Sequence, residues 1–193
     1  MKKIASPLFQ DLSEAELDTL AAAGHLRTRQ FAKHEVIFRA GSCVREIGIV
    51  LRGSVHIENL DLWGTKSILS SVGAGQAFAE TYAFCGEALM VDAVAAEHCE
   101  ILFLHTAAFT DARIEPALQD KLLRRLLAVS MRKNLSLSQR IFCTTPKTVR
   151  GRLLTYFSAQ AARCGRMEFE VPFNRQQMAD YLNLDRSALS KEL

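Results

Sequence analysis

The sequence predicts an α+β protein in which a strand-rich N-terminal part precedes a helical C-terminal part. Between Val36 and about Leu104, apolar stretches of strand length alternate with glycines, whereas Pro116 opens a stretch to about Ile141 without internal Gly or Pro. Two short amphipathic segments follow near the C-terminus. Many short strands with regular turns are typical of a barrel or a double-sheet roll, and an uninterrupted run of helix formers predicts one long helix.

Composition places the chain among ordinary globular proteins. It has 193 residues, of which 49% are hydrophobic and 23% charged, so we expect one or two domains. No apolar run is long enough to span a membrane, and the N-terminus turns acidic before a signal-peptide core can form. We therefore expect a cytoplasmic protein with no membrane partner. Five scattered cysteines without a C-x-x-C pair favour reduced thiols over disulfides or a zinc site.

Charge divides the chain into two unlike parts. Residues 1–120 carry 10 Lys and Arg against 16 Asp and Glu, and residues 121–193 carry 14 against 5. Between Lys121 and Arg152 there are nine basic residues and no acidic one. This run indicates a face that meets a polyanion, or alternatively a solvated helix face.

The N-terminal part begins with a short helix and continues as strands. Leu12–Gly24 reads as a helix, because Ser13 and Glu16 form a capping box and Gly24 fits the C-terminal stop. The clearest strands are VIF at 36–38, IGIVL at 47–51, SVHIE at 54–58 and EILFL at 100–104.

The long helix carries a wide apolar stripe. Its residues recur at four- and three-residue spacing, with Leu123 and Leu127 beside them: Leu118, Leu122, Leu126 and Val129. A stripe of this width can face both its own domain and a second chain, so we predict a homodimer joined through this helix. The alternative is a helix that is buried wholly against its own chain.

A domain boundary is predicted at Thr144–Pro146, because proline disfavours helical geometry in the residue before it. Helical periodicity resumes over Thr148–Ala162, and MEFEV at 167–171 reads as a short strand. The predicted parts are a roll domain with a short N-terminal helix at 1–115, a dimerisation helix at 116–143 and a small helical domain at 144–193.

The last 21 residues predict a helix-turn-helix. Asn174 can cap a helix that buries Met178, Ala179 and Leu182, and Asp185 can cap a second helix that turns Ala188 and Leu189 inward. The second helix of such a pair enters the major groove. We predict DNA contacts for residues at the start of the first helix and on the second helix: Arg175, Gln176, Arg186, Ser187, Ser190 and Lys191.

Arg186 is the best candidate for reading a base, since its planar fork matches guanine O6 and N7. Lys191 can contact a base or a phosphate. The alternative is a helix pair that only packs.

The order of a roll, a long helix, TVRGRLL and FNRQQMADYLNLDRSALSKEL resembles the CRP/FNR family of bacterial transcription regulators. HEVIFRAGS, IGIVLRGSVHI and GAGQAFAE resemble the family's effector domain. The resemblance implies an effector-sensing roll, a homodimer on a two-fold symmetric DNA site, and a winged helix-turn-helix domain that ends early here at Leu193. The resemblance is also compatible with RNA polymerase as a further partner.

One departure from the family concerns cyclic nucleotides. The resemblance implies a phosphate-binding segment with a glycine, a glutamate and a later arginine followed by Ser or Thr. This chain keeps Glu80 but has Ala79 for the glycine and Leu89–Met90 where the arginine and hydroxyl are expected. A cyclic phosphate would lose its charge-assisted contact, so we predict that cyclic AMP is not the effector. Arg52 and Arg113 show no spacing that suggests compensation.

The effector is predicted to be an unknown small molecule, uncharged or aromatic, bound in the roll. The candidate effector residues are Phe78, Glu80, Tyr82, Leu89 and Met90, with Phe84 beside them. The alternative is a plain packed core. We predict no cofactor: an iron–sulfur cluster lacks grouped cysteines, and the five histidines are isolated, although haem is harder to exclude.

The leading hypothesis is therefore a sequence-specific DNA-binding regulator that is switched by an effector about the Thr144–Pro146 hinge. A ligand-sensing or protein-interaction module with a purely structural helix-turn-helix is the alternative. An enzyme is the weakest hypothesis, because no paired carboxylates, metal spacing or nucleophile with a base is present.

Overall fold

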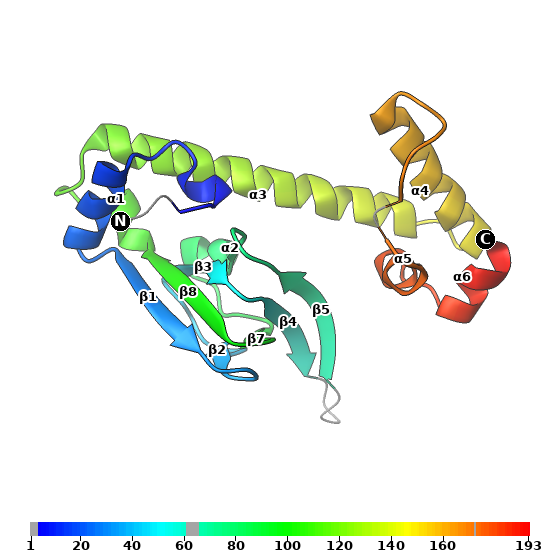
Figure 1. The fold of residues 1–193 in the computed structure, drawn as a ribbon, viewed down its shortest axis with the longest axis horizontal. Coiled ribbons are helices and arrows are strands. Elements are labelled where there is room, and N and C mark those ends of the chain that lie inside the picture. Colours follow the sequence, from blue (N-terminus) through cyan, green and yellow to red (C-terminus); the bar gives the residue numbers. More distant parts are fainter. Residues whose placement is uncertain (1–3, 61–65, 172) are drawn as a thin grey trace. The chain divides into compact units, whose positions relative to one another are not determined.

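The computed structural model describes residues 4–60, 66–171 and 173–193, which belong to two compact units, Met1–Ser130 and Met131–Leu193. The helices of the first unit are η1 (Pro7–Phe9), α1 (Glu14–Ala22), α2 (Glu80–Cys85) and η2 (Thr106–Phe109). Its strands are β1 (Leu26–Phe31), β2 (Val36–Phe38), β3 (Glu46–Arg52), β4 (Val55–Leu60), β5 (Lys66–Val72), β6 (Ala77–Phe78), β7 (Asp92–Ala95) and β8 (Cys99–His105). The second unit holds α4 (Val149–Cys164), α5 (Arg175–Leu182) and α6 (Arg186–Glu192), and α3 (Pro116–Thr144) runs through both (Figure 1).

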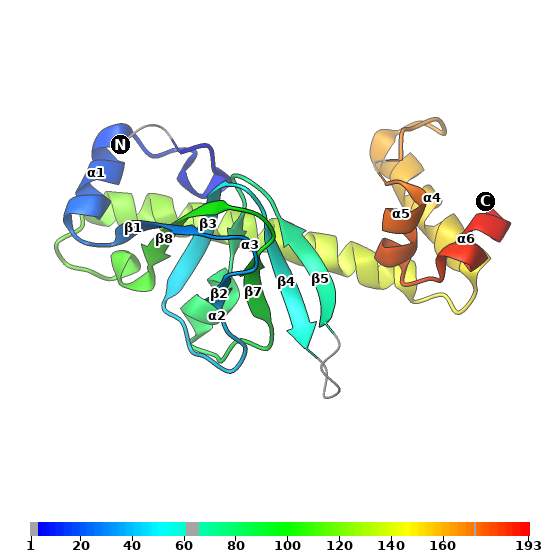
Figure 2. The ribbon, with the colours of Figure 1, turned by 60° about the horizontal axis from the view of Figure 1, so that its bottom comes forward.

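The first unit is a roll of two antiparallel sheets, as predicted. One sheet has the strand order β1-β8-β3-β6 and the other β2-β7-β4-β5 (Figure 2). All four strands expected from the sequence are present within a residue or two of their expected bounds. The predicted capping box of Ser13 and Glu16 is also confirmed, although the helix spans Glu14–Ala22.

Strand β8 explains why its sequence reads as a continuous apolar run. Ile101 and Phe103 point into the core between the sheets, while Leu102 and Leu104 belong to the core under α1 and α3. Successive side chains of a strand face opposite sides of the sheet, so a strand that is covered on both faces needs apolar residues at every position.

Gly48 in β3 makes room for the ring of Phe78. A Cβ at residue 48 would lie 2.2 Å from Phe78 Cζ, and Phe78 is itself buried. Gly48→Ala is therefore expected to lower the free energy of unfolding by about 1–3 kcal/mol, the usual range for overpacking a core. Urea unfolding measures this change, with Gly73→Ala as a control for general glycine effects, because a Cβ at residue 73 would meet nothing closer than Gln76 Oε1 at 4.0 Å. An unchanged midpoint for Gly48→Ala would contradict the packing argument.

The first half of α3 is part of the core of the roll. Leu118, Leu122 and Leu126 are buried in one cluster with side chains of α1, β3 and β8, and Val129 is half-buried. The prediction that these three leucines form a dimer seam is therefore corrected, because their surfaces are already covered by their own chain. The exposed apolar residues of α3 are Leu123, Leu127, Met131, Leu135, Leu137, Ile141 and Phe142.

The domain prediction also changes. The division falls at Ser130/Met131, inside α3, rather than at the two ends of the helix. Residues at the start of α3 pack on the roll, whereas Cys143 is buried with Leu153 and Tyr156 in the core of the second unit. The long helix is consequently shared between two cores and is not a separate part.

The strand predicted at 167–171 is absent, and this segment has no regular secondary structure. A strand needs a hydrogen-bonded neighbour, and the described residues of the second unit contain no other strand that could pair with it. Among the described helices, none has the length and apolar character that a membrane crossing requires.

Candidate functional site

The helix pair α5–α6 forms as its sequence predicts. Asn174 Oδ1 accepts from Gln177 N at 2.9 Å, and Gln177 Oε1 accepts from Asn174 N at 2.9 Å, which completes a capping box. Asn183 ends α5 in the left-handed conformation, at φ 52°. This conformation is tolerated best by Gly and Asn, so the sharp turn into α6 is encoded at this residue.

Asp185 fixes the first turn of α6. Its Oδ1 accepts from Ser187 N at 2.8 Å, from Ala188 N at 3.1 Å and from the hydroxyl of Ser187 at 2.5 Å. These donors, with the Ser187 hydroxyl first, hold the pKa of Asp185 below its usual range. The aspartate therefore stays ionised and keeps the start of α6 in place.

The inward faces of the two helices pack as expected. Met178, Ala179, Leu182 and Leu189 are buried in one core with residues of α3 and α4. Ala179 is fully buried, which fits the close approach that a small residue permits. Ala188 is half-buried.

Most of the residues predicted to contact DNA lie on the outside of this pair. Arg175, Gln176, Arg186, Ser187 and Lys191 are exposed, while Ser190 is half-buried. Gln176 Nε2 donates to Asp180 Oδ1 at 2.9 Å, and the hydroxyl hydrogen of Ser187 is used within the cap. Arg186 stands at the first residue of α6 with its side chain toward solvent.

The basic run from Lys121 to Arg152 is partly used inside the chain. Lys121, Arg124 and Arg125 pair with Glu16, Asp120 and Asp11. Arg140 and Arg152 donate to backbone carbonyls of α5 and of the turn that follows it. At least five of the nine cations therefore have partners in their own chain, and the case for a polyanion interface depends mainly on α5 and α6.

The residues predicted to bind an effector differ in how far they are buried. Phe78 and Leu89 are buried and Tyr82 is half-buried, whereas Met90 is 77% exposed and so points outward. Glu80 is buried at the first residue of α2. Met90 therefore lies outside the packed interior that holds Phe78 and Leu89.

Phe84, which was expected beside these residues, packs on Phe109, with ring centroids 5.5 Å apart. Ala79, which precedes Glu80, has φ 61°. This left-handed conformation favours glycine.

Aromatic rings fill the space between the two sheets. Phe38 lies against Phe78 at 5.7 Å and against Phe103 at 5.6 Å, and Phe103 lies against Phe31 at 6.1 Å between ring centroids. Offset and edge-to-face contacts at these distances are favourable. The alternative of a plain packed core therefore describes the middle of the roll.

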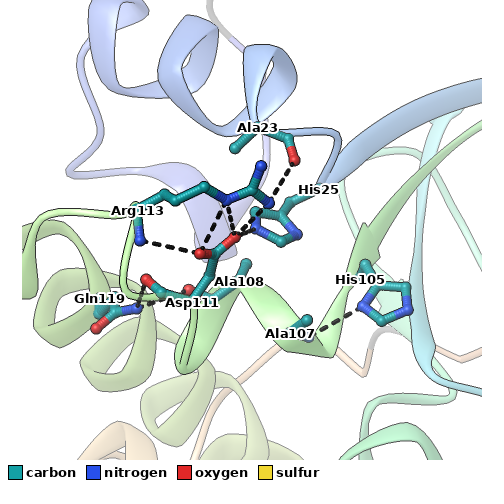
Figure 3. Close-up of polar contacts among 8 residues, drawn as sticks. All are labelled: Ala23, His25, His105, Ala107, Ala108, Asp111, Arg113 and Gln119. Carbon is teal, nitrogen blue, oxygen red and sulfur yellow. Dashed lines mark hydrogen bonds and ion pairs between the residues drawn. The ribbon is translucent and has the colours of Figure 1, made fainter.

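A polar cluster that the sequence did not reveal lies where β1 begins and where η2 leads toward α3 (Figure 3). Asp111 accepts from Arg113 Nη2 at 2.7 Å and from Arg113 N at 2.9 Å, and it lies 2.7 Å from His25 Nε2. Arg113 also donates to Ala23 O, and Gln119 donates to the carbonyl of Asp111. Arg113 is thus committed to this cluster.

The Arg113 guanidinium, with help from Arg113 N and His25, holds the pKa of Asp111 far below its usual range. Such a carboxyl stabilises the fold above its unfolded pKa of about 3.9, and this contribution is lost as the pH falls toward the folded value. Asp111→Asn is expected to reduce the loss of stability between pH 5 and pH 2, as measured by urea unfolding. Glu87→Gln, which removes an exposed carboxyl, is the control. Equal acid sensitivity of Asp111→Asn and the unchanged protein would contradict this role.

A cavity in the second unit is lined by residues of α3, α4 and α5, among them Cys143, Tyr156, Arg163 and Tyr181. The hydroxyl of Tyr156 is buried without a hydrogen-bond partner among the described residues. Burial raises the pKa of this tyrosine. None of the predicted effector residues lines this cavity.

All five cysteines are free thiols. Among residues 4–60, 66–171 and 173–193, no group of three His, Cys, Asp or Glu side chains could hold a metal ion. The sequence predicts that the five histidines are isolated from one another. His25 and His105 are an exception, because their ring centroids lie 6.5 Å apart.

Part of the first unit matches a known domain family. Residues 28–113 match the family model of the cyclic nucleotide-binding domain. No curated protein sequence matches significantly. The catabolite activator protein of Thermus thermophilus is 25% identical with a TM-score of 0.55, and the match covers 97% of this chain and 84% of that one.

Two other solved structures share the fold. A cyclic nucleotide-binding domain from Methylobacillus flagellatus is 20% identical with a TM-score of 0.59, over 69% of this chain and 74% of its own. FixK2 from Bradyrhizobium japonicum is 18% identical with a TM-score of 0.56, over 86% of this chain and 82% of its own.

Proposed function

We propose that the chain, whose residues 28–113 match the cyclic nucleotide-binding domain family, is a homodimeric, sequence-specific DNA-binding regulator of the CRP/FNR type. The α5–α6 pair carries this proposal, because it presents Arg186 at the start of a capped and solvent-exposed helix. Residues 131–193 contain 11 Lys and Arg against 5 Asp and Glu, which favours a polyanionic partner. The likeness to the Thermus protein along nearly the whole chain adds support.

In this function α6 enters the major groove and α5 lies across the backbone. Arg186 donates two hydrogen bonds to guanine O6 and N7, and Lys191 contacts a base or a phosphate. Arg175 and Gln176, at the first turn of α5, and the serines of α6 hold the pair in register through phosphate contacts.

Two chains join through the exposed stripe of α3. Leu123, Leu127, Met131 and Leu135 recur at every fourth position, and each is about half exposed or more. Apolar side chains at this spacing lie along one face of a helix. An isologous contact of this face with its copy gives the two-fold symmetry that a symmetric DNA site requires.

DNA binding is tested by fluorescence anisotropy with a random-sequence duplex at two salt concentrations. Phosphate contacts make the affinity fall steeply with salt, so the expected result is salt-dependent binding that a selected symmetric site strengthens. Absent or salt-insensitive binding by the folded protein would favour a sensing or interaction module in which α5 and α6 only pack.

The effector of the roll is proposed to be a small molecule other than cyclic AMP. Leu89 is buried and Met90 is exposed at the positions where the family resemblance implies a phosphate-binding arginine and a hydroxyl. Phenyl rings occupy the middle of the roll. A charged phosphate bound there would lose its hydration without a cation to pair with it, which is energetically costly.

Calorimetric titration with cyclic AMP and cyclic GMP up to millimolar concentration is expected to give no binding heat. A circular dichroism spectrum of the same sample confirms that the protein is folded. Saturable binding of either nucleotide would overturn this part of the proposal and would show that a phosphate site is built from other residues.

A further inference from the structure

Two half-buried arginines contact the end of α5 from different helices. Arg140, near the end of α3, donates from Nη2 to Asp180 O at 2.9 Å and from Nε to Tyr181 O at 3.0 Å. Arg152, in the first turn of α4, donates from Nη1 to Leu182 O at 3.0 Å and to Asn183 O at 2.7 Å. Four consecutive carbonyls, 180–183, are therefore each bonded to a guanidinium.

These carbonyls are the groups that a helix cannot satisfy by itself. The last four C=O groups of an α-helix have no intrahelical partner, and they carry the negative end of the helix dipole. At the helix end, the amide of Asn183 donates to Ala179 O and Asp180 O, and the amide of Leu184 donates to Ala179 O. A planar guanidinium with several donors suits a row of carbonyls better than an ammonium group does.

Each arginine also has a second anchor. Arg152 Nε donates to Pro146 O at 2.8 Å, so the same side chain ties the α3–α4 connection to the turn after α5. The guanidinium carbon of Arg140 lies 5.9 Å from the centre of the Tyr181 ring. Both side chains are thereby held in one orientation.

We infer that Arg140 and Arg152 are positioning residues that set the place of α6. The turn Asn183–Asp185 joins the end of α5 directly to Arg186, the first residue of α6. A shift of the α5 end would move the Arg186 side chain by a similar amount, and base-edge hydrogen bonds tolerate little displacement. This role in DNA reading rests on the proposed function, whereas the clamp itself does not.

The variants Arg140→Lys, Arg140→Gln and Arg152→Lys test the inference in the 193-residue chain. Arg163→Lys and Arg163→Gln are matched controls, because Arg163 is exposed in α4 and, among the described residues, its side chain donates within its own helix, to Gln160 Oε1 at 2.6 Å. The first readout is amide hydrogen exchange in the absence of DNA. The second is the affinity for a selected duplex and its salt slope.

Both Arg140 variants and Arg152→Lys are expected to speed exchange of the amides at 183–188 about tenfold, since each loses hydrogen bonds between a charged donor and the backbone carbonyls at the end of α5. The affinity for the selected duplex is expected to fall about tenfold with the salt slope unchanged, and the Arg163 variants are expected to change neither quantity.

A phosphate contact would behave differently. In that case Arg140→Lys would keep wild-type affinity, and Arg140→Gln would lower the salt slope by about one. That result, or unchanged exchange at 183–188, overturns the positioning role. If the unchanged protein fails to bind DNA while exchange responds as expected, the clamp stands and the proposed function fails.

Discussion

Arg186→Ala is expected to weaken binding to a selected symmetric DNA site by about 1–3 kcal/mol in each half-site, because a bidentate contact to one base pair is lost. In a two-fold complex both half-sites lose this contact, so the total effect is the largest that we expect from one substitution. The specificity should relax at one base pair of each half-site. Competition titrations with duplexes that carry each of the four base pairs at every position measure both quantities.

The control for this prediction is Arg166→Ala, which removes an exposed cation of the second unit outside α5 and α6. It is expected to reduce binding equally for all sequences or not at all. If Arg186→Ala weakens binding to every sequence by the same factor, Arg186 contacts phosphate and the assignment as a base reader is wrong.

Leu127→Glu is expected to convert the proposed dimer into a monomer. Leu127 is 55% exposed, so the substitution disturbs the core of the roll little, but a dimer would bring two carboxylates together in an apolar seam. Burial of unpaired charges is costly enough to abolish association. Light scattering should then give a mass of 21.5 kDa instead of twice that value, and binding to a symmetric site should fall with it.

Met167→Glu provides the control, because this residue is 87% exposed and lies outside α3. It should leave the mass unchanged. A dimer that survives Leu127→Glu would show that the exposed stripe of α3 is not the seam.

Features encoded within a few residues were predictable from the sequence. Ser13, Asn174 and Asp185 cap their helices as predicted, since a cap depends on the next three residues alone. Four strands of the roll, β2, β3, β4 and β8, were predictable as alternating or continuous apolar runs between turn residues, whereas the alternating run at 167–171 forms no strand.

Features that depend on distant partners were not predictable. The stripe of α3 showed that the helix is amphipathic, but not that Leu118, Leu122 and Leu126 face the roll while Leu123 and Leu127 remain exposed. Which of these two sets of leucines is buried depends on where the roll packs against the helix.

The residues of the candidate sites also divide into those that were predictable from the sequence and those that were not. The outward residues of α5 and α6 followed from helical geometry, whereas Arg140 and Arg152 resembled other solvent-facing cations, because the carbonyls that they contact at the end of α5 are at least 30 residues away. In the roll, Leu89 and Met90 were expected to share a pocket, but Leu89 is buried and Met90 is exposed.

The pairing of β1 with β8 has a consequence for how the chain folds as it is synthesised. Leu26 pairs with Leu104 and Phe31 with Cys99, so β1 emerges from the ribosome long before its neighbour exists. The entropy of closing so long a loop slows folding. The apolar side chains of β1 and β3 stay uncovered until β8 arrives, and they are the segments for which aggregation competes with folding. The helical contacts of residues 131–193 join residues that are closer in sequence than the paired residues of β1 and β8, so the second unit should complete its fold sooner after synthesis than the roll does.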